Sequence, residues 1–118
     1  GLDSKQEYIV DINRKRCILS RITYQNRVYT DTSLLRLDID TKPHRNPDGK
    51  KINGTHLHVY REGYADAWAY ELNNPYLKNI KHDFDFSTLI DVDLINRFYA
   101  FSTLCNFTNI ILLYYPLV

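Results

Sequence analysis

The feature that most constrains the fold is a strict alternation of apolar and charged residues in the first half of the chain. In residues 35–40, Leu35, Leu37 and Ile39 alternate with Arg36, Asp38 and Asp40. In residues 56–60, Leu57 and Val59 alternate with His56, His58 and Tyr60. A period of two places successive side chains on opposite faces of a strand. Residues 34–40 and 55–61 are therefore predicted to be strands that bury one face and turn a polar face away from the core.

Further strands are predicted at residues 16–24, at 27–30 after a turn at Gln25-Asn26, and at 65–72. Residues 16–24 are the first clear strand in the sequence. The segment 41–54 carries Lys-Pro, Asn-Pro-Asp-Gly and Asn-Gly, which are turn signals. It is predicted to be a loop of about fourteen residues, and loops of that length in small domains often carry function.

The pattern changes after residues 73–75, where an acidic and aromatic connector at residues 82–86 leads into a predicted amphipathic helix. Its apolar stripe consists of Leu94, Phe98, Phe101 and Cys105. Asp91 and Asp93 lie at its start, where carboxylates accept from free amides and interact favourably with the helix dipole. Residues 110–115 are predicted to be a buried strand. The expected fold is α+β, with a mostly antiparallel sheet of five to six strands packed on one principal C-terminal helix.

Composition indicates one globular domain over residues 1–118, because 118 residues with 44% hydrophobic and 25% charged residues can form a single core. The formal net charge of +1 excludes a broad electrostatic attraction to nucleic acid or to an anionic membrane. The longest apolar run, residues 110–115, is too short to span a bilayer. We expect a cytoplasmic protein without a membrane partner, in which Cys17 and Cys105 are buried thiols.

Local charge is a separate matter from net charge. Arg14-Lys-Arg16, followed by Arg21 and Arg27 among tyrosines, combines cations with stacking surfaces, as single-stranded nucleic acid requires. The simpler interpretation is a solvated basic face. We favour the solvated face over a nucleic-acid groove.

The constellation that points to chemistry is a set of three histidines, His44, His56 and His58. If the strands at 34–40 and 55–61 pair, Asp38 and Asp40 lie beside the imidazoles of the second strand. A carboxylate that accepts the second ring proton of a histidine fixes its tautomer and raises its basicity. His44, on the intervening loop, is then able to fold over the pair.

Three interpretations of this cluster remain open at the level of sequence. The first is a metal-independent ribonuclease, in which the three histidines act as acid and base, Tyr60 adds a donor, and Arg61 or Arg45 steadies the phosphate. The second is a metal site, in which His56 and His58 are joined by His44 or Asp38. The third is a structural or partner-binding polar face, and neither of the last two requires catalysis.

Several short motifs resemble a known family. They are Leu-Leu-Arg-Leu-Asp-Ile-Asp, Pro-His-Arg-Asn-Pro-Asp-Gly, Thr-His-Leu-His-Val-Tyr-Arg-Glu-Gly-Tyr, Asp-Ala-Trp-Ala-Tyr and Leu-Cys-Asn. In that order and spacing they resemble the small bacterial and phage proteins of the domain of unknown function 6978, over residues 8–109. Members usually have a lysine where Ala67 stands and a proline where Glu71 stands. The resemblance also implies a helical segment before residue 1, which this chain would then lack.

The resemblance implies no activity, but it implies a setting of conflict between bacteria and phages. Our leading hypothesis is a toxin-like ribonuclease that acts on RNA without a cofactor. The alternative is a phage-encoded inhibitor of a host defence nuclease, similar to an anti-CRISPR, or another binding module without activity. The partner would be RNA, a nuclease or a cognate antitoxin, and the oligomeric state stays open. Candidate binding residues are Arg36, Asp38, Asp40, Arg45, Asp48 and Trp68.

Overall fold

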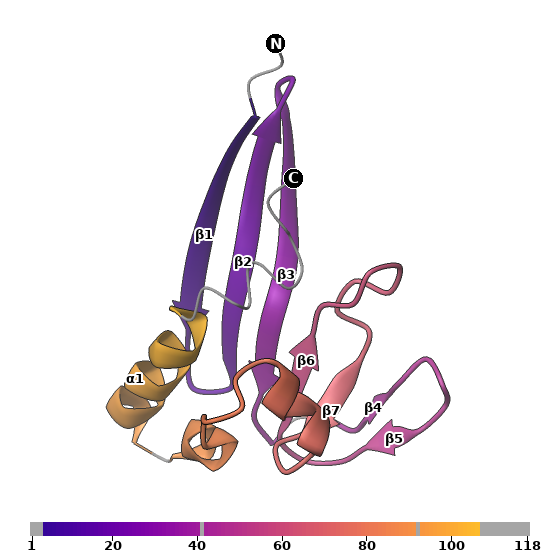
Figure 1. Ribbon diagram of the computed structural model, residues 1–118, viewed down its shortest axis with the longest axis vertical. Coiled ribbons are helices and arrows are strands. Elements are labelled where there is room, and N and C mark those ends of the chain that lie inside the picture. The colour runs from indigo at the N-terminus through magenta and orange to yellow at the C-terminus, as the bar shows by residue number, and fades with distance from the viewer. Residues whose placement is uncertain (1–3, 41, 92, 107–118) are drawn as a thin grey trace.

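The computed structural model describes residues 4–40, 42–91 and 93–106, which form an α+β fold (Figure 1). A five-stranded antiparallel sheet has the order β1-β2-β3-β6-β7. Its strands are β1 (Ser4–Ile12), β2 (Arg16–Gln25), β3 (Val28–Asp38), β6 (His56–Val59) and β7 (Ala69–Glu71). A separate two-stranded sheet consists of β4 (His44–Arg45) and β5 (Lys51–Ile52). The predicted fold class is confirmed.

Three helical segments follow the strands. They are the 3-10 helices η1 (Pro75–Asn79) and η2 (Phe86–Ile90) and the α-helix α1 (Leu94–Cys105). As predicted, an aspartate caps α1, because the Asp93 carboxylate accepts a hydrogen bond from the Ile95 amide at 2.9 Å. None of the helices in the described part of the chain has the length and apolar character needed to span a bilayer.

The three long strands β1, β2 and β3 extend as an arm away from the helices and the short strands (Figure 1). The strand β1 was not predicted, and the first strand expected from the sequence begins at residue 16. The reason is visible in its burial, since β1 is an edge strand in which Tyr8, Ile9 and Val10 are all exposed. An edge strand without a buried face shows no apolar alternation in its sequence.

The predicted strands at 27–30 and 34–40 are one continuous strand, β3. The hairpin before it turns at Asn26 and Arg27, both with positive φ, one residue later than predicted. The pairing of β2 with β3 shifts by one residue next to Leu34, which forms a β-bulge. The bulge allows Leu34 and Leu35, adjacent in sequence, both to be fully buried.

One face of the sheet carries the hydrophobic core. Cys17 and Leu37 are register partners, and Leu37 pairs in turn with Leu57, so apolar side chains from three strands form a row. The helical segments add side chains to this core: Leu77, Ile80, Phe86, Leu89, Phe101 and Leu104. The opposite face of the sheet is therefore left for the charged residues of β3 and β6.

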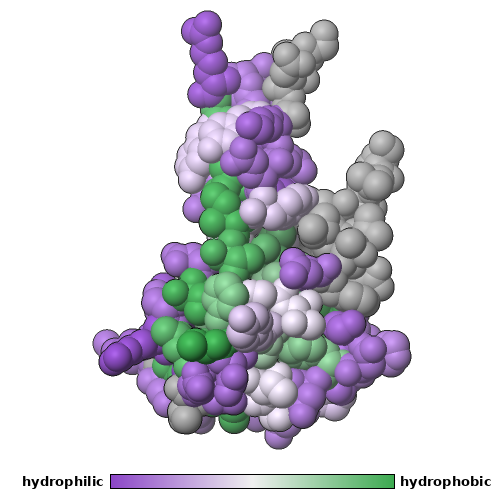
Figure 2. Space-filling model, turned by 90° about the vertical axis from the view of Figure 1, so that its left-hand side faces the viewer, coloured by the Kyte–Doolittle hydropathy of each residue, from purple (hydrophilic) through white to green (hydrophobic). Residues whose placement is uncertain are grey.

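The predicted apolar stripe of α1 is partly wrong. The buried residues of the helix are Arg97, Phe101, Leu104 and Cys105. Leu94 and Phe98 are 41% and 48% exposed, and they line a pocket together with Val10 and Ile12 of β1. Figure 2 shows a hydrophobic band on this side of the molecule. The buried face of the helix contains Arg97 instead of Leu94 and Phe98. Arg97 donates to the backbone carbonyls of Asp91 and Arg14, which fixes the helix against the β1–β2 turn.

Two further predictions need correction, and one lies outside the described residues. The predicted loop 41–54 contains the β4–β5 hairpin, and the predicted strand 65–72 is reduced to β7. Its first part is a turn in which Ala65 has a positive φ of 52° and forms only a single bridge with Arg61. The predicted strand 110–115 lies outside the described residues.

Cys17 and Cys105 are both buried and free, as predicted. Burial in apolar surroundings raises the pKa of the Cys17 thiol to about 11, because the thiolate would be poorly solvated there. Burial also raises the pKa of the Cys105 thiol. Both side chains therefore act as small apolar groups of the core.

Truncation of the core on β3 should destabilise the protein strongly. Leu37 is fully buried, so Leu37→Ala is expected to lower the free energy of unfolding by about 2–5 kcal/mol through lost burial and a residual cavity. Val28→Ala, on the same strand at a position 61% exposed, is the matched control and should change it by less than about 0.5 kcal/mol. Urea unfolding measures both, and equal effects would contradict the assignment of the core.

Candidate functional site

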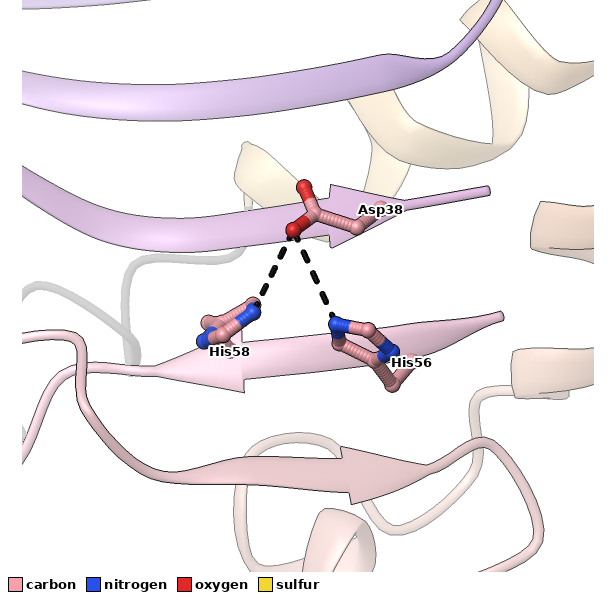
Figure 3. Close-up of side chains that lie close together, drawn as sticks. All are labelled: Asp38, His56 and His58. Atoms are coloured by element: carbon pink, nitrogen blue, oxygen red, sulfur yellow. Dashed lines mark ion pairs between the residues drawn. The ribbon is translucent and has the colours of Figure 1, made fainter. Parts of the chain in front are cut away.

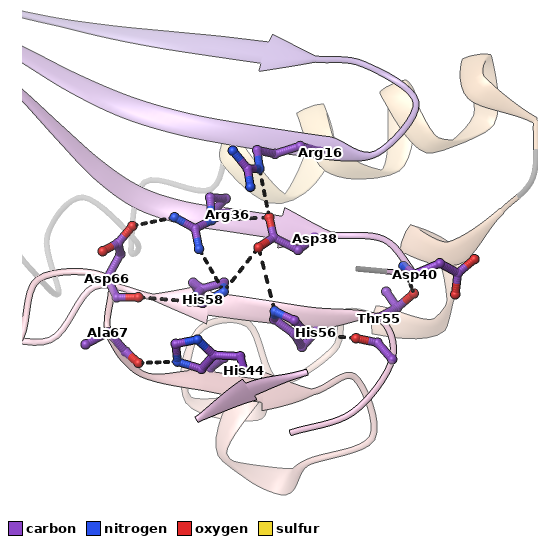
Figure 4. Close-up of polar contacts among 12 residues, drawn as sticks. Arg16, Arg36, Asp38, Asp40, His44, Thr55, His56, His58, Asp66 and Ala67 are labelled. Atoms are coloured by element: carbon purple, nitrogen blue, oxygen red, sulfur yellow. Dashed lines mark hydrogen bonds and ion pairs between the residues drawn. The ribbon is translucent and has the colours of Figure 1, made fainter. Parts of the chain in front are cut away.

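The candidate site lies on the charged face of the sheet, and strand register assembles it (Figure 4). Arg16 on β2, Asp38 on β3 and His56 on β6 form one row across the three strands. Arg36 and His58 form the next row. The predicted pairing of the strand at 34–40 with the strand at 55–61 is therefore confirmed. Of the two carboxylates expected beside the imidazoles, Asp38 contacts them, and Asp40 forms no described contact with them.

The centre of the site is a buried carboxylate with two imidazoles (Figure 3). Asp38 Oδ2 lies 3.3 Å from His58 Nε2 and 3.6 Å from His56 Nε2. One ligand atom from each of the three residues lies within 4.8 Å of the others. Both histidines are 1% exposed and Asp38 is 4% exposed. These polar side chains are as buried as the residues of the hydrophobic core, so each requires a hydrogen-bond or ionic partner.

Backbone carbonyls determine the orientation of both imidazoles. His56 Nδ1 lies 2.8 Å from the Gly54 carbonyl oxygen, and His58 Nδ1 lies 2.9 Å from the Asp66 carbonyl oxygen. A carbonyl oxygen only accepts, so Nδ1 donates in both rings. In the neutral form of each ring Nε2 then carries a lone pair, whereas in the protonated form it carries an N–H that donates toward Asp38.

Two arginines hold the other carboxylate oxygen. Arg16 Nε and Arg36 Nε donate to Asp38 Oδ1 at 3.1 and 3.2 Å. Arg36 also forms an ion pair with Asp66 through Nη1 at 2.8 Å. These contacts leave Asp38 Oδ2 directed at the imidazoles.

The Nε2 atom of His58 has two neighbours with opposite requirements. Arg36 Nη2, a permanent donor, lies 3.0 Å away and needs the lone pair of Nε2. Asp38 Oδ2, an acceptor at 3.3 Å, needs a proton or a cation at the same atom. The site therefore contains more acceptors than its own donors can satisfy when both histidines are neutral.

The surroundings also determine the ionisation of Asp38. Burial would by itself raise the pKa of this carboxyl group, but contacts with His56 and His58 and a neighbouring guanidinium hold the pKa well below its usual value of 3.8. Asp38 is therefore a carboxylate under all ordinary conditions. A fixed negative charge is the first requirement for binding a cation here.

His44 joins the imidazoles from β4. Its ring centroid lies 4.6 Å from that of His58 and 5.9 Å from that of His56. Its Nε2 lies 2.7 Å from the Ala67 carbonyl oxygen and so donates to it. The three histidines predicted from the sequence thus lie together, but Asp38 rather than His44 supplies the third atom of the convergent set.

Other predicted site residues lie elsewhere. The Arg61 guanidinium stacks 4.3 Å from the centre of the Trp68 ring and donates to the Tyr70 hydroxyl, so it joins an aromatic cluster. Tyr60 packs against the hydrophobic core.

The remaining predicted residues belong to loops and to the β4–β5 hairpin. Asp40 follows the end of β3 with a positive φ of 49°, and its amide donates to the Thr55 hydroxyl. Arg45 and Asp48 lie in the exposed hairpin. None of these three residues forms a described contact with the imidazoles.

Two members of the site were not predicted to belong to it. Arg16 was interpreted as part of a basic face. Because it is adjacent to the apolar residue Cys17 in the same strand, alternation already placed its side chain on the polar face of β2. Asp66 was missed because it lies in the turn between β6 and β7 and not in a strand. Its backbone carbonyl contacts His58, and its carboxylate contacts Arg36. The alternation of the sequence was therefore sufficient to predict the position of Arg16, but not that of Asp66.

Acid should destabilise the fold through Asp38. Because the pKa of this carboxyl group is lower in the folded than in the unfolded protein, its ionised form stabilises the fold above about pH 4. That stabilisation is lost as the pH falls through the folded pKa. Urea unfolding at a series of pH values should show this loss, and Asp38→Asn should flatten the dependence and cost about 3–5 kcal/mol at neutral pH. Asp31→Asn, an exposed carboxylate on the same strand, should behave as the wild type.

Comparison with known proteins gives a family but no activity. No curated protein and no solved structure matches the chain. A family model described as "Family of unknown function (DUF6978)" matches residues 1–110, which cover nearly the whole chain. The chain therefore belongs to this family of unknown function.

Proposed function

We propose that the protein binds a divalent transition-metal ion through Asp38, His56 and His58. The observation that carries this proposal is the convergence of three acceptor atoms at a buried point, with both histidines oriented by backbone carbonyls. Lone pairs that face one another and a carboxylate repel unless a cation lies between them. A metal ion would satisfy all three atoms at once, with Arg36 Nη2, which lies 3.0 Å from His58 Nε2, displaced from that lone pair.

The distances are compatible with such an ion. Zinc binds imidazole nitrogen and carboxylate oxygen at about 2.0–2.2 Å, so neighbouring ligands of a tetrahedral site lie about 3.3–3.6 Å apart. The separations between Asp38 Oδ2 and the two Nε2 atoms are 3.3 and 3.6 Å. The three ligand atoms lie within 4.8 Å of one another, so the two imidazoles would have to move closer together to complete a tetrahedral set.

The surroundings resemble those of metal ligands in general. Metal-binding histidines usually donate their other ring N–H to a carbonyl or carboxylate, which fixes the tautomer. His56 and His58 both do so, to Gly54 and to Asp66. Two imidazoles with one carboxylate suit zinc, nickel, copper or iron better than magnesium or calcium, which prefer oxygen ligands. Zinc is the ion that we propose, with His44, whose ring centroid lies 4.6 Å from that of His58, as the fourth ligand.

Burial supports a structural role for the ion rather than a catalytic one. Structural zinc sites are closed, whereas catalytic sites keep a position open to substrate. At 1% exposure His56 and His58 are closed off, and neither lines the larger described cavities. The ion would join β3 to β6 and so add its binding energy to the stability of the fold.

Metal titration tests the proposal. Protein stripped with chelator should take up one equivalent of zinc per chain, and cobalt(II) should give the visible absorption of a low-coordinate site. His58→Gln should weaken zinc binding by more than about 100-fold, since loss of an outer partner alone costs 10–100-fold. His82→Ala, which removes an exposed histidine outside the cluster, should leave it unchanged.

Two outcomes would contradict the metal site. One is a folded wild-type protein that takes up no zinc, nickel or cobalt at neutral pH, which would show that protons alone satisfy the cluster. The other is equal weakening by His58→Gln and His82→Ala, which would place binding elsewhere. The wild-type measurement decides the question even if the His58 variant fails to fold.

Metal-independent ribonuclease activity stays a prediction. It requires RNA to reach imidazoles that are buried, so the burial of His56 and His58 favours metal binding over this hypothesis. The hypothesis expects RNA cleavage that persists in chelator and is lost in His58→Ala. Cleavage that is absent from the wild type, or equal in the two proteins, would remove it.

Inhibition of a host nuclease also stays a prediction. Arg45 and Asp48, the residues proposed for that contact, are exposed and available to a partner. Co-purification with a nuclease that is lost in Arg45→Glu would support it, with Arg27→Glu, an exposed arginine at the far end of the arm, as the matched control. Equal retention of a nuclease by both variants would speak against it.

A further inference from the structure

The β4–β5 hairpin concentrates positive charge in a short exposed segment. Residues 42–51, the basic hairpin, contain Lys42, Arg45, Lys50 and Lys51 against the single carboxylate of Asp48. All four cations are exposed. The whole chain carries a formal net charge of only +1, so this excess is a local property of the basic hairpin.

The placement of these cations works against the stability of the hairpin. Arg45 and Lys51 are direct register partners, so two like charges lie opposite each other on adjacent strands. Lys50 immediately precedes Lys51 in the sequence and adds a third positive charge. No ion pair joins any of these cations to a described residue. The Asp48 carboxylate is engaged in the turn, where it accepts from the Lys50 amide at 2.9 Å. Uncompensated repulsion in a two-stranded sheet points to a ligand that supplies the missing negative charge.

The basic hairpin is also held in one conformation. The Asn46 side chain donates to the Ala69 carbonyl at 2.9 Å and accepts from the Ala69 amide at 2.8 Å, which fixes the hairpin to β7. Arg45 Nη1 donates to the Gly49 carbonyl, which closes the turn. A hairpin whose backbone is already fixed loses little backbone entropy on binding, as a prepared binding surface requires.

We propose that the basic hairpin binds the phosphate backbone of a nucleic acid. Regularly spaced phosphates offer the repeated negative charge that the four cations lack, and backbone contacts of this kind need no recognition of bases. An interface with a protein usually has an apolar or aromatic centre. Among the described residues, the large exposed apolar side chains lie on the arm, on η2 and α1 and in the β6–β7 turn, and none belongs to the basic hairpin.

Fluorescence anisotropy of the full chain with labelled nucleic acid tests this proposal. A duplex DNA, a single-stranded DNA and a single-stranded RNA of mixed sequence distinguish the source of the phosphates. The test variant is Lys50→Ala/Lys51→Ala, because these two side chains form no described hydrogen bond and their removal also relieves the cross-strand repulsion. The control is Arg14→Ala/Lys15→Ala, which removes two exposed cations from the β1–β2 turn.

The expected result combines weaker binding with unchanged or higher stability. The hairpin variant should bind at least one of the three probes less tightly. On duplex DNA the slope of log affinity against log salt should become shallower by about 1.8, or about 0.9 for each phosphate that the variant no longer neutralises. Its melting temperature should equal or exceed that of the wild type. The control variant should retain wild-type affinity and slope.

Three results would overturn the proposal. They are a wild-type protein that binds none of the probes at low salt, a hairpin variant that binds them as tightly as the wild type, and a control variant whose affinity falls as much as that of the hairpin variant. The last would transfer binding to the turn at Arg14 and Lys15. Because the cluster of Asp38 and its histidines is unchanged in all variants, none of these results bears on the metal site.

Discussion

The ionised carboxylate of Asp38 is the group on which the polar half of the structure depends. It is almost completely buried, yet it receives two guanidinium contacts from Arg16 and Arg36 and faces two imidazoles. A buried charge of this kind is tolerated only when its partners surround it. Since those partners come from β2, β3 and β6, the register of three strands is tied to one carboxyl group.

The same network joins the sheet to the segments that cover it. His58 donates to the turn between β6 and β7, and His44 and Asn46 attach the basic hairpin to the end of that turn and to β7. The candidate metal site and the basic hairpin are therefore neighbours with different exposure. The buried site suits a small ion, whereas the exposed hairpin suits a large charged partner, so the two proposals can be tested independently.

Sequence patterns predicted those parts of the site that depend on strand periodicity. Asp38, His56 and His58 were expected to meet because alternation placed them on the polar faces of two strands that were expected to pair. The strand β1 was missed, because an exposed edge strand leaves no alternation to detect. Asp66 was missed, because a turn rather than a strand delivers it. In α1, Arg97 occupies the buried face that an apolar stripe predicted for Leu94 and Phe98.

Local periodicity and turn chemistry were sufficient to predict the α+β class, the two central strands and the common face of their charged residues, because these properties depend on neighbours a few positions apart. Burial of the histidines required the tertiary structure, since the alternation alone was equally compatible with a solvated face. The covering segments, the carbonyls that orient the rings and the two arginines come from distant parts of the chain. Only their packing turns a polar strand face into an enclosed set of polar side chains.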